Sequence, residues 1–167
     1  LGSRGFRRRV ERPVPGIPVV ETATLELRQR LEHGAGGGRD EQVPGDEFVA
    51  RLVERAKQIK VGDTMDYDSD LGPLVPAQQR ETVENYVRIG KEEGAKLVLG
   101  GGRPQGEQYE RGYWFEPTIF TEVENSMTIA QEEIFGPVLA IIPYNSEADA
   151  IAIANDSQYG LAGGVWG

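Results

Sequence analysis

Residues 131–138 near the end of the chain combine a carboxylate, an aromatic ring and a turn. Glu133 is followed two positions later by Phe135, and then by Gly136 and Pro137. A glycine–proline pair before an apolar segment fixes the directions of the side chains around it. A carboxylate held there could accept hydrogen bonds from two neighbouring ribose hydroxyls, and the phenylalanine could pack on a flat ring. The alternative, which the residue types alone favour, is a surface glutamate and a core phenylalanine at the entrance to a strand.

Other side chains that do chemistry are scarce in this chain. The 167 residues include no cysteine, which excludes disulfides, thiolate–zinc sites and thiol nucleophiles. His33 is the one histidine, and it cannot form a metal site alone. No Gly-x-Ser-x-Gly sequence is present to place a serine nucleophile on a sharp turn. The sequence alone therefore predicts no catalytic residue and no metal site.

An acidic segment has the spacing of a calcium loop but lacks its other requirements. Asp66, Asp68 and Asp70 stand at the first, third and fifth positions of such a loop. Leu71 then takes the place of the glycine that the turn needs, and Ala77 the place of the bidentate glutamate. We therefore interpret the segment as a solvated loop.

A glycine cluster, Gly100 to Gly102 with Gly106, follows an expected strand, as in a dinucleotide-binding fingerprint. Such a fingerprint must open a helix, so that backbone amides face the pyrophosphate. Residues 103–105 lead instead into a polar loop. The cluster is therefore interpreted as a connection between two strands.

Charge divides the chain into two regions. Residues 1–45 carry a balance of +2, with an arginine cluster in the first twelve positions, and residues 46–167 carry −11. The net charge of −9 disfavours general nucleic-acid binding, although the arginine cluster alone would permit it. No apolar run approaches the about 20 residues that a membrane span needs. A mean hydropathy of −0.44 and the lack of cysteine fit a cytoplasmic protein.

The hydrophobic pattern predicts helices alternating with apolar strands, which favours an α/β fold with a parallel sheet. We expect one helix after an Asp46 N-cap, burying Phe48 to Ile59 on one face and ended by Gly62. A second helix is expected from Ala77 to Glu93, with a Glu84–Arg88 ion pair and a stop at Gly94. Further elements are expected as a short helix at 21–32, strands at 96–99, 113–123, 137–143 and 161–166, and a helix at 148–154.

Several ordered motifs resemble the aldehyde dehydrogenase superfamily. The segment Glu132 to Val138 resembles one of the family's most recognisable motifs, and the resemblance covers roughly residues 46–167. The other matching segments are 70–74, 93–96 with 100–102, 113–120, and 155–165. The resemblance implies a Rossmann-like, partial catalytic domain at 46–167, after a basic, irregular leader at 1–45 without family resemblance.

The resemblance also implies a chemistry, the NAD- or NADP-dependent oxidation of an aldehyde to a carboxylic acid. Glu133 would hold the ribose next to the nicotinamide, and Phe135 would pack near the nicotinamide ring. Gln79 matches a family glutamine near the cofactor. Thr82 stands where the family often has a lysine, so that contact is not carried over.

The chain lacks the cysteine nucleophile that the resemblance implies for the first step of the reaction. By spacing, the family's nucleophilic cysteine would fall near residues 30–33, which read Arg-Leu-Glu-His. We therefore expect a truncated or frame-disrupted product that is inactive alone and associates with itself or with a larger dehydrogenase subunit. The alternative is a non-catalytic binding or interaction module that keeps the α/β scaffold.

Overall fold

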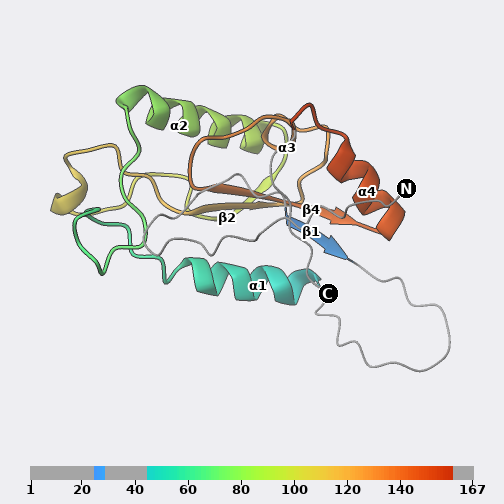
Figure 1. Ribbon diagram of the computed structural model, residues 1–167, viewed down its shortest axis with the longest axis horizontal. Coiled ribbons are helices and arrows are strands. Elements are labelled where there is room, and N and C mark those ends of the chain that lie inside the picture. The colour runs from blue at the N-terminus through green and yellow to red at the C-terminus, as the bar shows by residue number, and fades with distance from the viewer. Residues whose placement is uncertain (1–24, 29–44, 160–167) are drawn as a thin grey trace, which may run out of the picture.

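The computed structural model describes residues 25–28 and 45–159, which form a mixed sheet between helices (Figure 1). The strands lie in the order β1-β4-β3-β2. Their bounds are β1 Leu25–Arg28, β2 Lys96–Leu99, β3 Thr118–Thr121 and β4 Val138–Tyr144. The helices are α1 Gly45–Ala56, α2 Ala77–Glu92, α3 Thr128–Gln131 and α4 Glu147–Asn155, with a 3₁₀ turn at Glu107–Tyr109.

The expected α/β class is confirmed, but the sheet is not parallel throughout. β4 runs parallel to β1 and β3, whereas β2 runs antiparallel to β3. A parallel pair needs a crossover, which α3 supplies between β3 and β4, while no α-helix joins β2 to β3. The connection instead folds back on itself. A Cβ at Gly100 would lie 2.1 Å from the Pro117 carbonyl oxygen, so only glycine permits this close approach.

β4 carries apolar side chains on both faces, because successive residues of a strand point in opposite directions. Val138, Ala140 and Ile142 belong to one core with Val83 and Val87 of α2. Ile141, with Ile119 of β3, packs against Ala56 of α1 and the partly buried residues Val49, Leu52 and Val53. The sheet is thus sandwiched between α2 and α1 (Figure 1).

The two long helices were predicted well, and their local details less well. Asp46 lies in the first turn of α1 rather than before it, and Ile59 lies beyond the end of α1 and is 39% exposed. Gly94 does end α2, with the positive φ of 102° that this position requires. The predicted Glu84–Arg88 pair is wrong, because Arg88 pairs with Glu92 on the next turn.

The helix expected at 21–32 is also wrong where the structure describes it. Leu25–Arg28 is a strand paired in parallel with residues 141–144 of β4. Leucine and charged residues alternate there with a period of two, which suits a strand as well as a short helix, and pairing with β4 decides between them. The strand expected at 161–166 and the position of His33 lie outside the described residues.

The remaining predictions agree with β2, β4 and α4 within a few residues, whereas the strand expected at 113–123 is shorter, because β3 covers only Thr118–Thr121. Gly100 to Gly106 is a connecting segment between β2 and β3, as expected, and no helix begins there. Among the described residues, no helix is long and apolar enough to cross a membrane.

Candidate functional site

The segment 132–137 is a tight turn between α3 and β4. Glu132 is extended, with φ −118° and ψ 144°, at the end of α3. Two short hydrogen bonds then shape the backbone: Gly136 N donates to Ile134 O at 2.7 Å, and Val138 N donates to Gly136 O at 2.8 Å. The Pro137 carbonyl accepts from Thr118 N at 2.8 Å, which joins the turn to the start of β3. The turn is therefore fixed by backbone contacts at its β4 end.

At that end, the turn also lies directly on α2. The Gln79 side-chain amide Nε2 donates to Phe135 O at 2.8 Å. Gly136 lies so close to α2 that an added Cβ would be 2.5 Å from Cγ2 of Val83. The glycine is needed here for close approach of backbone to helix, since no positive φ is involved.

A third contact with α2 lies at the other end of the turn. The Tyr86 hydroxyl donates to Glu132 Oε2 at 2.7 Å. Gln79, Val83 and Tyr86 are separated by four and three residues, so they follow one another along the same side of the helix. We call this the turn-facing side of α2.

Held in this way, the turn leaves the Phe135 ring exposed and the Glu133 side chain partly exposed. Ile134 is buried, at 1% exposure, whereas Phe135 is 65% exposed. Glu133 is partly buried, and its carboxylate has no hydrogen bond or ion pair with another described residue. The prediction of a core phenylalanine at this turn is therefore wrong.

The contact with Glu132 changes the acidity of Tyr86. The hydrogen bond to Glu132 raises the pKa of Tyr86 from 10.0 to about 12, with further contributions from burial and from the negative charge of Glu132. If Tyr86 lost its proton, the phenolate would lie beside the negative Glu132 carboxylate with no hydrogen bond between them. The phenol therefore stays protonated, and a donor, at neutral pH.

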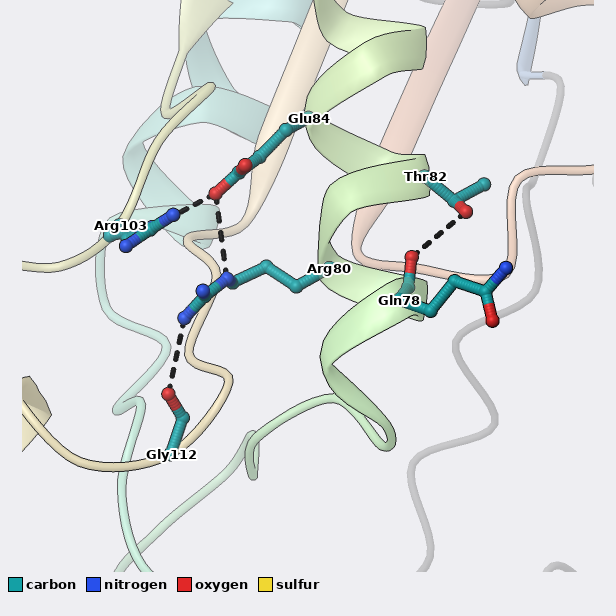
Figure 2. A network of polar contacts seen from close by, with 6 residues as sticks. All are labelled: Gln78, Arg80, Thr82, Glu84, Arg103 and Gly112. Atoms are coloured by element: carbon teal, nitrogen blue, oxygen red, sulfur yellow. Dashed lines mark hydrogen bonds and ion pairs between the residues drawn. The ribbon is translucent and has the colours of Figure 1, made fainter.

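The next side of α2 holds a different loop through charges (Figure 2). Arg80 Nη1 donates to Gly112 O at 3.2 Å, and its guanidinium lies 5.5 Å from the centre of the Tyr113 ring. Glu84 Oε1 lies 3.5 Å from Arg80 Nε and accepts from Arg103 Nε at 2.9 Å. We call this the loop-facing side of α2, because it attaches residues 103–113 to the helix.

Thr82 lies on the opposite side of the helix from this network (Figure 2). Its hydroxyl donates to Gln78 O at 2.9 Å, within α2 itself. A threonine in this position offers neither the charge nor the reach of a lysine. The structure thus shows no side-chain contact from Thr82 to the turn.

Two other features lie apart from the turn. A cleft of 770 Å³ lies between the end of α1 and the loops around residues 60–69 and 100–117, and neither Gln79, Glu133 nor Phe135 lines it. The acidic loop uses its carboxylates locally, since Asp70 Oδ2 accepts from Lys60 N and Asp66 Oδ1 from Asp68 N. Within the described residues, no group of three or more His, Cys, Asp or Glu side chains is arranged to hold a metal.

The partners that hold the turn were not predicted from the sequence. The hydrophobic pattern predicted the helix that carries Val83 and Tyr86 but did not link these residues to residues 132–136. The available signal was the spacing of Gln79, Val83 and Tyr86 along one side of a helix. The segment that this side would contact was not evident from the sequence.

The described residues thus form an α/β segment whose glycine–proline turn carries an exposed aromatic ring and a carboxylate without a partner among the described residues. The sequence model of the aldehyde dehydrogenase family matches residues 41–167, and the chain belongs to this family. Betaine aldehyde dehydrogenase of Bacillus subtilis (strain 168) is 50% identical over 121 residues. That alignment covers 72% of this chain and 25% of the relative, so the chain spans about a quarter of the length of the curated relatives it matches.

Solved structures agree with this assignment. Aldehyde dehydrogenase of Mycobacterium tuberculosis, complexed with NAD+, is 57% identical with a TM-score of 0.70, over 72% of this chain and 25% of that one. Betaine aldehyde dehydrogenase of Staphylococcus aureus, in complex with NAD+, is 42% identical with a TM-score of 0.68, over 70% and 23% of the two chains. The family predicted from the sequence motifs is thus confirmed for this part of the chain.

Proposed function

We propose that residues 132–136 form one wall of the nicotinamide site of an NAD- or NADP-dependent aldehyde dehydrogenase. The observation that carries the proposal is the turn itself, in which Gln79 and Val83 hold the backbone while Glu133 and Phe135 stay available. The family membership and the NAD+-bound relatives support the same assignment.

The residues present fit the nicotinamide half of such a cofactor. The Glu133 carboxylate has no partner among the described residues and could accept hydrogen bonds from vicinal hydroxyls, and Phe135 offers an exposed flat ring. Gln79 acts on the cofactor indirectly, because its amide is used on Phe135 O. None of the described glycine segments opens a helix that could hold the pyrophosphate, so this wall serves the ribose and the ring.

The cofactor would supply hydride acceptance, and the chain's own residues would bind and orient its ribose. Glu133 would hold the ribose hydroxyls, and Phe135 would shield one edge of the ring from water. In the reaction implied by the family, a thiolate attacks the aldehyde, and this chain holds no cysteine to do so. We therefore propose that the 167-residue chain binds the nicotinamide half weakly and does not oxidise aldehydes by itself.

A titration with nicotinamide mononucleotide, followed by amide NMR signals of the full chain, tests the binding. We expect shifts concentrated at residues 132–136, and their loss in Glu133→Gln. Adenosine monophosphate is the matched control, since it has a ribose and a phosphate but no nicotinamide. Equal shifts with both nucleotides, or none at the turn with either, would refute the proposal.

An activity assay tests the second half of the proposal. Betaine aldehyde and a short aliphatic aldehyde would be offered with NAD and with NADP, and reduced cofactor would be followed by absorbance. We expect no turnover. Steady turnover by the purified chain would show that the cysteine-free chain has another nucleophile.

The alternative is a non-catalytic interaction module that uses the same scaffold. It is favoured by exposed apolar side chains away from the turn, including Val75 at 78% and Ile151 at 54% exposure. Self-association, or association with a larger dehydrogenase subunit, would cover them. Sedimentation of the chain, alone and with a full-length family member, separates these possibilities.

A further inference from the structure

The helix that leads into the turn, α3, is held at its first residue by a carboxylate from the end of α2. Thr128 N donates to Glu93 Oε2 at 2.8 Å, and Thr128 Oγ1 donates to Glu93 Oε1 at 2.6 Å. Hydrogen bonds to an ionised group are stronger than neutral ones. Both oxygens of Glu93 are thus engaged by a single residue that lies 35 positions further along the chain.

α3 has no side-chain cap from its own N-cap residue. It has only four residues, and its N-cap residue, Met127, makes no side-chain hydrogen bond to the helix. A helix of this length is marginal by itself, and the N–H groups of its first turn need partners from elsewhere. Glu93 supplies the partner of the Thr128 N–H group.

Glu93 is itself fixed to α2. It is the C-cap residue of that helix, and its backbone N donates to Ile89 O at 2.8 Å. The same residue therefore ends α2 with its backbone and caps α3 with its side chain. Because the Glu93 backbone belongs to α2, the start of α3 is fixed relative to that helix.

Glu93 also continues the turn-facing side of α2. An added Cβ at Gly90 would lie 3.0 Å from Ile129 Cδ1, which shows that α3 packs closely against α2 there. Gly90 follows Tyr86 by four residues and precedes Glu93 by three, so these positions share one side of the helix. Contacts with α3 and the turn thus come from Gln79, Val83, Tyr86, Gly90 and Glu93.

We propose that Glu93 is a positioning residue for the nicotinamide wall at residues 132–136, acting through α3. The inference rests on the proposed function of that wall. Glu93 lies about 20 Å from Gln79 along α2, at 1.5 Å per residue, and does not contact the cofactor in this proposal. It fixes where α3 begins, and α3 leads directly into the wall.

The path from Glu93 to the wall passes through a single residue. Thr128, which Glu93 holds, accepts a hydrogen bond from Glu132 N on its carbonyl oxygen at 2.9 Å. Glu132 is the first residue of the wall. Tyr86 also holds Glu132, and Ile129 is buried, so α3 keeps other supports when Glu93 is removed. We therefore expect a displaced wall rather than an unfolded one.

Glu93→Ala tests the proposal, because Glu93 is exposed and its partner Thr128 is neutral. We expect faster hydrogen exchange at the amides of Thr128 and Glu132, and displaced amide NMR signals at 132–136 in the free chain. The dissociation constant for nicotinamide mononucleotide should rise about threefold, within the effect of one hydrogen bond. Glu92→Ala is the matched control, since Glu92 pairs with Arg88 on the surface of α2, and it should leave these measurements unchanged.

The binding measurement separates positioning from general stability. If Glu93→Ala lowered only the midpoint of urea denaturation, with the dissociation constant and the signals at 132–136 unchanged, the proposal would be overturned.

A second variant tests whether the effect passes through Thr128. Thr128→Val removes the hydroxyl that donates to Glu93. In Glu93→Ala this hydroxyl has already lost its partner, so adding Thr128→Val should weaken binding no further. A full additional loss in the double variant would contradict the proposal, because Thr128 would then act independently of Glu93.

The two proposals fail in different ways. If the unmodified chain gives no shifts at 132–136 with nicotinamide mononucleotide, the proposed function fails. Hydrogen exchange and the amide signals of free Glu93→Ala still decide whether Glu93 positions the segment. Faster exchange at Thr128 and Glu132 with displaced signals at 132–136 would support it, and unchanged exchange and signals would refute it.

Discussion

The two sides of α2 hold neighbouring segments by different means. The turn-facing side uses one amide, one close packing contact and one phenol, from Gln79, Val83 and Tyr86. The loop-facing side uses Arg80 and Glu84, which share contacts with Arg103, Gly112 and Tyr113. The turn-facing side leaves the Glu133 carboxylate and the Phe135 ring without a partner among the described residues. On the loop-facing side, the charges of Arg80 and Glu84 are already engaged in contacts with each other and with the loop.

This difference indicates which side can serve binding. A side chain that holds a backbone atom, as Gln79 does, leaves the side chain of the held residue free. A side chain that pairs with another side chain uses both. Both kinds of contact occur on each side, because Tyr86 pairs with the Glu132 side chain and Arg80 also holds the Gly112 carbonyl oxygen. The turn-facing side differs in that the contacts of Gln79 and Val83 leave the Phe135 ring exposed.

The largest expected effect comes from Gly136→Ala, which breaks the turn-facing side. The added methyl would meet Val83 Cγ2 at 2.5 Å, and the branched valine has little freedom to move. We expect a loss of about 2 kcal/mol in the free energy of unfolding, as for other overpacked sites, measured by urea denaturation.

Two variants check the cause of that loss. Gly102→Ala is the matched control, because its Cβ would meet only Glu116 Oε2 at 4.0 Å, and it should cost little. Adding Val83→Ala to Gly136→Ala should recover part of the loss if the two side chains collide. Equal losses in the two glycine variants would contradict the close approach.

The next largest effect is expected from Arg80→Met, which breaks the loop-facing side. Arg80 is only 17% exposed, and methionine keeps much of its apolar stem while removing the charge. We expect a loss of about 1–2 kcal/mol on urea denaturation, since Glu84 keeps Arg103 as a partner. Binding of nicotinamide mononucleotide should stay unchanged, which would distinguish this side of α2 from the other.

Arg88→Met is the control for Arg80→Met. Arg88 is 57% exposed and pairs with Glu92 on the helix surface. Its removal should change stability by less than about 0.5 kcal/mol. A similar loss in both variants would mean that the Arg80 network behaves as an ordinary surface network.

Tyr86 gives a pH-dependent test of the turn-facing side. Its pKa is about 12 in the folded chain and near 10.0 when unperturbed, so the folded state holds the proton more tightly. The resulting stability is fully present below pH 10 and is lost as the pH rises through 12. Because Tyr86 is partly exposed to solvent, we expect this loss to be about 1 kcal/mol.

The measurement compares the unmodified chain with Tyr86→Phe by urea denaturation at pH values from 9 upward. Other tyrosines and lysines titrate in both proteins, so the difference between the two curves isolates Tyr86. The gap in stability should narrow as the pH rises. A constant gap would show that the phenol is not protected by its contact with Glu132.

The sequence was sufficient for elements whose pattern is local. The apolar periodicity of α2 and the glycine after it predicted both ends of that helix, and the continuous apolar run of β4 predicted a buried strand. The antiparallel direction of β2 was missed, because it depends on how the chain between 100 and 117 folds back. The leucines at 25 and 27 were compatible with a short helix or a strand, and the structure shows a strand that pairs with β4.

The site was predicted by family motif and not by its physical support. Residue types pointed to Glu133 and Phe135, the resemblance added Gln79 and a nicotinamide role for all three, and these roles toward a cofactor stay predictions. The bond from Gln79 to Phe135 spans 56 residues, and that from Tyr86 to Glu132 spans 46. Contacts at such separations leave no periodic trace in one sequence. The Glu84–Arg88 prediction is wrong for a related reason, because Glu84 pairs with Arg80 and with Arg103, which lies 19 residues away in the sequence.

The smallest effect is expected at Thr82, which belongs to neither of the two sides. Its hydroxyl bonds Gln78 O within the helix, a pattern that adds little to helix stability (Figure 2). Alanine has the higher helix propensity, so Thr82→Ala should raise the free energy of unfolding by about 0.3–0.5 kcal/mol. Glu81→Ala, at the preceding exposed position, should change it even less, since glutamate is already a good helix former. If Thr82→Ala binds nicotinamide mononucleotide as the unmodified chain does, the proposed cofactor contact is limited to the turn-facing side. Weaker binding would mean that the site also includes this third side of α2.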